Sequence, residues 1–129
     1  MNNKNDIKTF VINKLGCNCP SEVFNIIEGQ KDIQLDQNIN LNYKINIGNR
    51  LLIYVIEIND KEFLRQNLLT IVAHGIDERN QNNFNRFRLV IISNNIDEID
   101  KSGQRLFDTI LKGDQKAHLH IVRKKDFVI

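Results

Sequence analysis

Two alternating apolar segments joined by a Gly-Asn pair constrain the fold of this chain more than any other feature. From residue 39 to residue 47, every second residue is apolar and those between are Asn or Lys, which is the period of a strand with one solvated face. Gly48-Asn49 is a typical two-residue turn into a second strand over 50–58. A one-residue slip would destroy the predicted register. That register pairs Ile45 with Leu52, Tyr43 with Tyr54, Leu41 with Ile56 and Ile39 with Ile58.

The second arm of this hairpin is apolar on both faces. Leu51, Ile53 and Val55 alternate with the residues that meet the first arm, so we expect a central strand that is covered on both sides. A helix could supply the second cover. A second copy of the chain could do so equally well, and a homodimer through this face is therefore one expectation.

Helical and strand patterns alternate along the rest of the chain. Ile7–Leu15 is rich in β-branched and aromatic residues and predicts a first strand, and Pro20 to Gly29 predicts a short helix. Asn59 with Glu62 forms a capping box for a long helix that either ends at Gly75 or extends to about Asn80. Its buried stripe is predicted to comprise Leu64, Leu68, Ile71, Val72 and Gly75. The remaining elements are a buried strand over 88–93, a helix from Asn95 to Lys112-Gly113, and a strand over 117–122.

The predicted order is βαββαβαβ in a single domain over residues 1–129. This is an α/β (α+β) chain with a mixed sheet, in which a ferredoxin-like split βαβ core carries an appended helix and strand. A length of 129 residues suffices for one buried core.

Charge and composition exclude several classes of protein. The 18 basic and 16 acidic side chains give a net charge of only +2, so nucleic acid is an unlikely partner. The first residues are polar, and no apolar run approaches the length of a membrane helix. We expect a soluble, cytoplasmic protein. The chain lacks a phosphate-binding glycine loop, a nucleophile elbow and a metalloprotease helix, which favours a binding protein over an enzyme.

Both cysteines, Cys17 and Cys19, are separated by one residue at the predicted passage from the first strand to the first helix. In this register Cys19 falls at or near the helix N-cap, a position that lowers the pKa of a thiol. Paired thiolates bind soft ions such as Cu(I) or Zn(II), and a closed zinc site needs about four ligands. His118 and His120 are the candidates for the other two, because alternation along a strand points both to one face. The alternative is that both histidines lie on the wetter side of the last strand while Leu119 and Ile121 face the core.

The segment Gly16-Cys17-Asn18-Cys19, followed by apolar Val23 and Ile27, resembles part of the small heavy-metal-associated domains with a ferredoxin-like fold. Those domains carry a cysteine pair between their first strand and first helix. The similarity covers about the first quarter of the chain, and the pair here has one intervening residue where the family usually has two. The resemblance implies binding of a soft ion such as Cu(I) by Cys17 and Cys19.

Two alternatives to metal binding remain open. A thiol at a helix N-terminus with a neighbouring cysteine can also carry out disulfide exchange. The other is a non-enzymatic interaction or structural domain in which the cysteines are incidental. Glu57-Ile58-Asn59 lacks the lysine of a nuclease carboxylate set, and the basic residues at 86–88 and 123–125 are most simply solvated.

Overall fold

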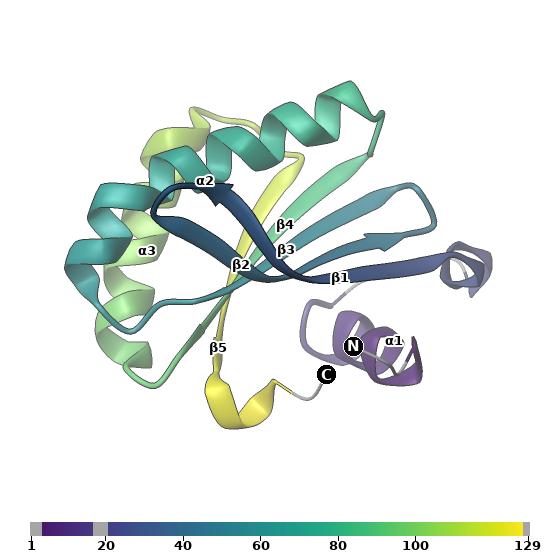
Figure 1. Ribbon diagram of the computed structural model, residues 1–129, viewed down its shortest axis with the longest axis horizontal. Coiled ribbons are helices and arrows are strands. Elements are labelled where there is room, and N and C mark those ends of the chain that lie inside the picture. Colours follow the sequence, from purple (N-terminus) through teal and green to yellow (C-terminus); the bar gives the residue numbers. More distant parts are fainter. Residues whose placement is uncertain (1–3, 17–20, 128–129) are drawn as a thin grey trace.

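One five-stranded sheet organises the molecule in the computed structural model, which describes residues 4–16 and 21–127 (Figure 1). Its strands follow their order in the chain, β1-β2-β3-β4-β5. The first three are antiparallel, and β3, β4 and β5 are parallel. The described elements are α1 (Lys4–Asn13), η1 (Ser21–Asn25), β1 (Ile27–Asp36), β2 (Ile39–Ile47), β3 (Leu51–Glu57), α2 (Lys61–Gln81), β4 (Arg86–Ser93), α3 (Ile96–Leu111), β5 (Ala117–Arg123) and η2 (Lys124–Asp126).

The predicted mixed α/β class is confirmed, and so are the six elements from β2 to β5. The split βαβ arrangement is not the one that forms, because it would separate β3 from β4 by another strand, whereas these two pair directly. None of the helices within the described ranges is long and apolar enough to cross a bilayer.

Helices α2 and α3 both cover one face of the sheet, hereafter the α2 face (Figure 1). Each connects two parallel neighbours, and the strands are added in one direction, so right-handed crossovers place both helices on the same side. The predicted buried stripe of α2 is confirmed. At the C-terminal end of this stripe Gly75 lies against the ring of Phe87, and a Cβ built on this glycine would be 2.1 Å from the Phe87 Cζ. The stripe comprises Leu64, Leu68, Ile71, Val72 and Gly75.

The opposite face, hereafter the α1 face, is covered by the ten-residue helix α1 together with Val23, Phe24 and Phe127. The strand predicted over Ile7–Leu15 is wrong, because this segment forms α1 and the turn after it. Ile7, Phe10 and Val11 lie at helical spacing and are buried against the sheet. This helix supplies the cover that β3 needs: Leu51, Ile53 and Val55 are buried within the same cluster. A homodimer stays a prediction, but this face no longer calls for one.

Strand β1 was not predicted, and the helix that we expected from Pro20 to Gly29 is wrong. Within that range Ser21–Asn25 is a short 3-10 helix, and Ile27 begins β1. Strand β1 is an edge strand in which Ile27 is the only buried residue. Its apolar alternation is confined to Ile33 and Leu35 near its end, because the rest of the strand after Ile27 is exposed.

The hairpin β2–β3 forms as predicted, but its register differs by one residue. Ile47 pairs with Leu51, Ile45 with Ile53 and Tyr43 with Val55. The connection therefore has three residues instead of two, with Gly48 and Asn49 at positive φ and the Arg50 N–H donating to the Ile47 carbonyl. Helix α2 is likewise capped one residue later than expected, by the Asp60 carboxylate.

Candidate functional site

The predicted thiol site lies outside the described residues, since Cys17 and Cys19 fall within 17–20. The elements on either side are described. They are α1 and the five-residue 3-10 helix η1, where we expected a strand and an α-helix. The reason for expecting a low thiol pKa at a helix N-terminus is therefore lost.

His118 and His120 lie on β5 beside β4, and both are half-buried. In the parallel register His118 is level with Arg88 and His120 with Val90. Leu119 and Ile121 pack against the core on the α2 face, so the histidines point to the α1 face. His74 lies on the opposite face, on α2, and does not join them.

Arg88 connects the end of α1 to β5. Its Nη1 donates to the Leu15 carbonyl at 3.1 Å and lies 2.8 Å from the His120 Nε2. Arginine has no acceptor, so His120 Nε2 must be the unprotonated nitrogen of a neutral ring. Burial, together with Arg88 and His118, lowers the pKa of His120 to about 4, which agrees with a neutral imidazole at pH 7. Leu15 is two residues before Cys17 in the chain.

One edge of the Arg88 guanidinium has no partner among residues 4–16 and 21–127. Both protons of Nη1 are used by Leu15 and His120, whereas Nε is buried without a hydrogen bond and Nη2 donates to no described residue. Nε and Nη2 form the side of the guanidinium fork that matches two oxygens of a carboxylate or phosphate. None of the ion pairs in the described ranges includes Arg88.

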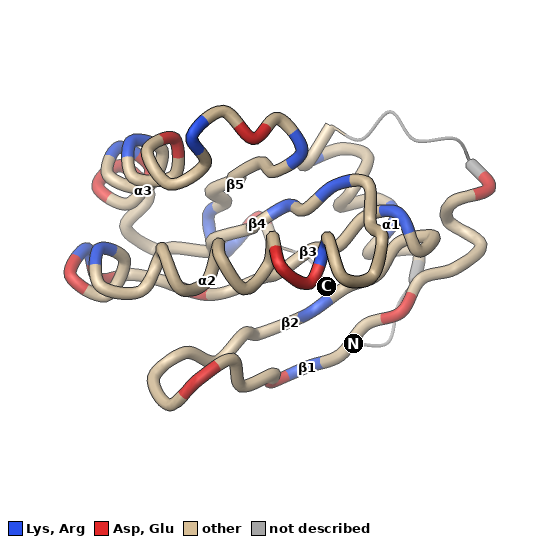
Figure 2. Tube along the Cα trace, turned by 90° about the horizontal axis from the view of Figure 1, so that it is seen from above, with Lys and Arg blue, Asp and Glu red and all other residues tan. Residues whose placement is uncertain are grey.

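The charges around Arg88 are positive. Burial and the neighbouring Arg86 lower the pKa of Arg88. Burial also lowers the pKa of His118, with further contributions from Arg88 and Arg86 that outweigh the opposite effect of Asp114. Elsewhere, basic and acidic residues are interspersed along the chain (Figure 2). We call Arg86, Arg88, His118 and His120 the arginine–histidine cluster.

A separate polar network lies on the α2 face. The fully buried Tyr54 donates its hydroxyl proton to the Glu78 carboxylate and lies 2.9 Å from the His74 Nδ1, and Lys44 forms an ion pair with Glu78. Because Tyr54 has one proton to donate, His74 Nδ1 must be the donor in their contact. Burial and Glu78 raise the pKa of Tyr54, which therefore stays protonated.

Polar groups also gather where the three parallel strands end, the usual location of ligand sites in open α/β sheets. Asn59 accepts from the Ser93 hydroxyl and the Asn94 N–H, while Lys124 lies 3.4 Å from Glu57. A cavity of about 320 Å³ opens there and is lined partly by the basic residues 123–125. These polar groups are hydrogen-bonded or ion-paired with one another, so we rank this edge below the arginine–histidine cluster as a candidate site.

Sequence reasoning found two of the four cluster residues. Arg86 and Arg88 were interpreted as a solvated entry to β4. The order of elements could have indicated these two residues. Strands β4 and β5 are parallel neighbours, so the basic residues at the start of β4 lie level with the histidines of β5.

No group of three or more potential metal ligands of the His, Cys, Asp and Glu types occurs in the described part of the chain. Comparisons with family models, curated proteins and solved structures give no match for this chain.

Proposed function

We propose that this protein binds the oxyanion of a small ligand, a phosphate or carboxylate group, through Arg88. The observation that carries the proposal is the unused Nε–Nη2 edge of this half-buried arginine. A buried donor without an acceptor costs about 1–3 kcal/mol, and more when it is charged. An oxyanion on this edge would receive two charge-assisted hydrogen bonds and would compensate the charge of Arg88.

The neighbours of Arg88 favour an anion over a cation. Arg86 adds a second positive charge, and both histidines have a lowered pKa and are neutral at pH 7. They can donate hydrogen bonds without adding charge. A bound anion would in turn favour the protonated imidazoles, so binding should strengthen as the pH falls and should raise the pKa of His120.

Titration with inorganic phosphate and with acetate tests this proposal, with the imidazole NMR signals of His118 and His120 as the readout. Sodium chloride at matched ionic strength corrects for screening. We expect saturable shifts in the wild-type protein and at least about tenfold weaker binding in Arg88→Gln. Arg65→Gln is the matched control, because Arg65 is exposed on α2 and pairs only with Glu62 among described residues.

Either of two results would contradict the proposal. One is the same shifts with sodium chloride alone as with phosphate and acetate. The other is equal affinity in wild type and Arg88→Gln. A response to phosphate but not acetate would identify a phosphate ligand, and the reverse a carboxylate ligand.

Soft-metal binding by Cys17 and Cys19 is the second candidate, and one observation favours it. His118 and His120 are both neutral at pH 7 and share the α1 face with Leu15, which precedes the cysteine segment. Neutral imidazoles are metal ligands, and two thiolates would balance the charge of Zn(II) beside Arg88.

Uptake of Zn(II) or Cu(I) by reduced protein tests the second candidate. About one ion per chain is expected, and uptake should disappear in the Cys17→Ser, Cys19→Ser double variant. Undiminished uptake in that folded double variant would exclude the cysteines as ligands. The thiol redox prediction requires a Cys19 pKa below that of free cysteine.

A further inference from the structure

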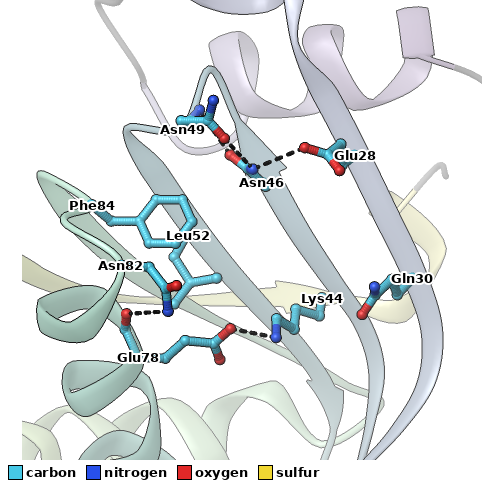
Figure 3. A pocket seen from close by; sticks show the side chains of 9 residues that line it. All are labelled: Glu28, Gln30, Lys44, Asn46, Asn49, Leu52, Glu78, Asn82 and Phe84. Atoms are coloured by element: carbon cyan, nitrogen blue, oxygen red, sulfur yellow. Dashed lines mark hydrogen bonds and ion pairs between the residues drawn. The ribbon is translucent and has the colours of Figure 1, made fainter.

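A polar groove on the α2 face is independent of the arginine–histidine cluster. It lies between strands β1 and β2 on one side and the C-terminal half of α2 on the other, and has a volume of about 300 Å³ (Figure 3). That volume is at the lower end of the range for small-molecule sites. The lining residues are Glu28, Gln30, Lys44, Asn46, Asn49, Leu52, Glu78, Asn82 and Phe84.

Several hydrogen-bonding groups of this groove remain available after its internal contacts. Asn46 donates to Glu28 at 3.2 Å and to Asn49 at 2.8 Å, and Asn82 donates to the Glu78 carbonyl at 3.0 Å. These bonds position the side chains and leave the Asn49 amide donors, the Asn82 amide oxygen and one Glu28 oxygen free of described partners. The Gln30 side chain has no hydrogen-bond partner among the described residues. Donors and acceptors therefore alternate around the groove.

The apolar part of the groove is small and concentrated. Leu52 is fully buried and Phe84 is half-buried, and Figure 3 shows the Phe84 ring beside Leu52 on the wall formed with Asn82. An aromatic ring of this kind packs against the C–H face of a saturated ring or against another flat ring.

Charge excludes an anionic ligand here. Glu78 is compensated by Lys44 and by the Tyr54 hydroxyl. Glu28 remains, so the lining is neutral to slightly negative. A phosphate or carboxylate would meet repulsion from Glu28, whereas an uncharged ligand would not.

We infer that this groove binds a neutral, polyhydroxylated ring, that is, a single sugar unit. The hydroxyls of a sugar are at once donors and acceptors and match the mixed amide and carboxylate lining. Its C–H face matches the half-buried Phe84 ring, which lies beside the buried Leu52. Planar nucleobases present fewer donors per ring and form the comparison in the test.

NMR titration of the full chain with glucose, galactose, mannose and N-acetylglucosamine tests the inference, with adenine, a nucleobase without a sugar ring, as the comparison. At least one sugar should shift the side-chain amide signals of Asn46, Asn49 and Asn82 saturably. Phe84→Ala should weaken that binding at least about tenfold. Phe24→Ala, which changes a half-buried phenylalanine on the α1 face, should not.

Gln30→Ala keeps the test decisive if Phe84→Ala fails to fold. The Gln30 side chain is exposed on β1 and has no hydrogen bond to a described residue, so its loss should weaken sugar binding and leave the fold unchanged. No saturable shift with any of the four sugars, or binding of adenine alone, would overturn the inference. Phosphate binding at Arg88 should be the same in these variants, which separates this site from the proposed function.

Discussion

Arg79 on the α2 face and Arg88 on the α1 face are both withdrawn from solvent, but their surroundings differ. Arg79 is only 6% exposed, and its Nη1 and Nη2 donate to the two Asp114 oxygens at 3.1 and 2.9 Å. Its Nε donates to Asn80. Toward the described residues Arg88 uses only Nη1, on a carbonyl and a neutral imidazole, and none of these residues places a carboxylate beside it.

This difference follows from how each face is covered. Two long helices close the α2 face, and Arg79 ties α2 to the loop that leads from α3 to β5. Among the described residues the α1 face is covered by the short helix α1 and a few side chains of η1 and the C-terminal segment, and Arg88 lies beside the turn that follows α1. A satisfied arginine is expected to stabilise the fold, and an unsatisfied one is expected to bind something.

The largest effect should come from breaking the satisfied pair. Arg79→Ala removes a bidentate partner and leaves Asp114 uncompensated, so we expect the free energy of unfolding to fall by about 3–4 kcal/mol. Urea denaturation measures the change. A loss below about 1 kcal/mol would mean that Arg79 does not join α2 to the α3–β5 loop as described.

Gly75→Ala probes the contact between α2 and the sheet. The added Cβ would enter the Phe87 ring, and relieving that overlap should cost about 2–3 kcal/mol by moving the helix or the ring. Gly113→Ala does not introduce a close contact and serves as a packing control, although its positive φ makes it mildly unfavourable. Equal stability of wild type and Gly75→Ala would contradict the tight approach.

Acidification should destabilise the protein through the α1 face. His120 titrates near pH 4 when folded and near 6.5 when unfolded, so the unfolded state binds more protons between these values. The contribution of His120 to the free energy of unfolding is therefore fully present above about pH 6.5 and is lost as the pH falls toward 4. We expect a loss of roughly 2 kcal/mol, because the partial exposure of His120 reduces the effect. His120→Gln should flatten this dependence in denaturation series. A pH profile identical to wild type would show that His120 is not buried against Arg88.

Arg88→Gln should change stability least. It loses two hydrogen bonds but removes a half-buried charge without an ionic partner, so we expect the free energy of unfolding to stay within about 1 kcal/mol of wild type. Thermal and urea unfolding in phosphate-free buffer measure it. A loss as large as that of Arg79→Ala would make Arg88 a structural residue and remove the contrast between the two faces.

Much of this fold could be predicted from the sequence, and the failures have physical causes. The buried runs of β3 and β4 and the stripe of α2 were recognised because burial leaves a pattern. Strand β1 shows only a short alternation at Ile33 and Leu35, because most of it is exposed at the sheet edge. In α1, β-branched residues suggested a strand although Ile7, Phe10 and Val11 follow helical spacing. The predicted hairpin register is wrong by one residue, because the loop has three residues where two were expected.

The site was harder to predict than the fold. His118 and His120 were placed on one face correctly, because strand alternation fixes it. Arg88 is 30 residues before His118 in the chain, and only the parallel pairing of β4 with β5 makes them neighbours. The cysteine prediction concerns residues 17–20, which are not described, and metal uptake will decide it.

The Nε–H signal of Arg88 tests the central claim most directly. In ¹⁵N-edited NMR spectra, with Arg88→Gln to assign the signal, inorganic phosphate or acetate should move it saturably while the Arg79 Nε–H signal stays in place. A bidentate oxyanion predicts a downfield shift and slower exchange with water, together with a rise in the pKa of His120. An Arg88 signal that is unchanged by both anions, in protein whose His120 still titrates near pH 4, would contradict the account.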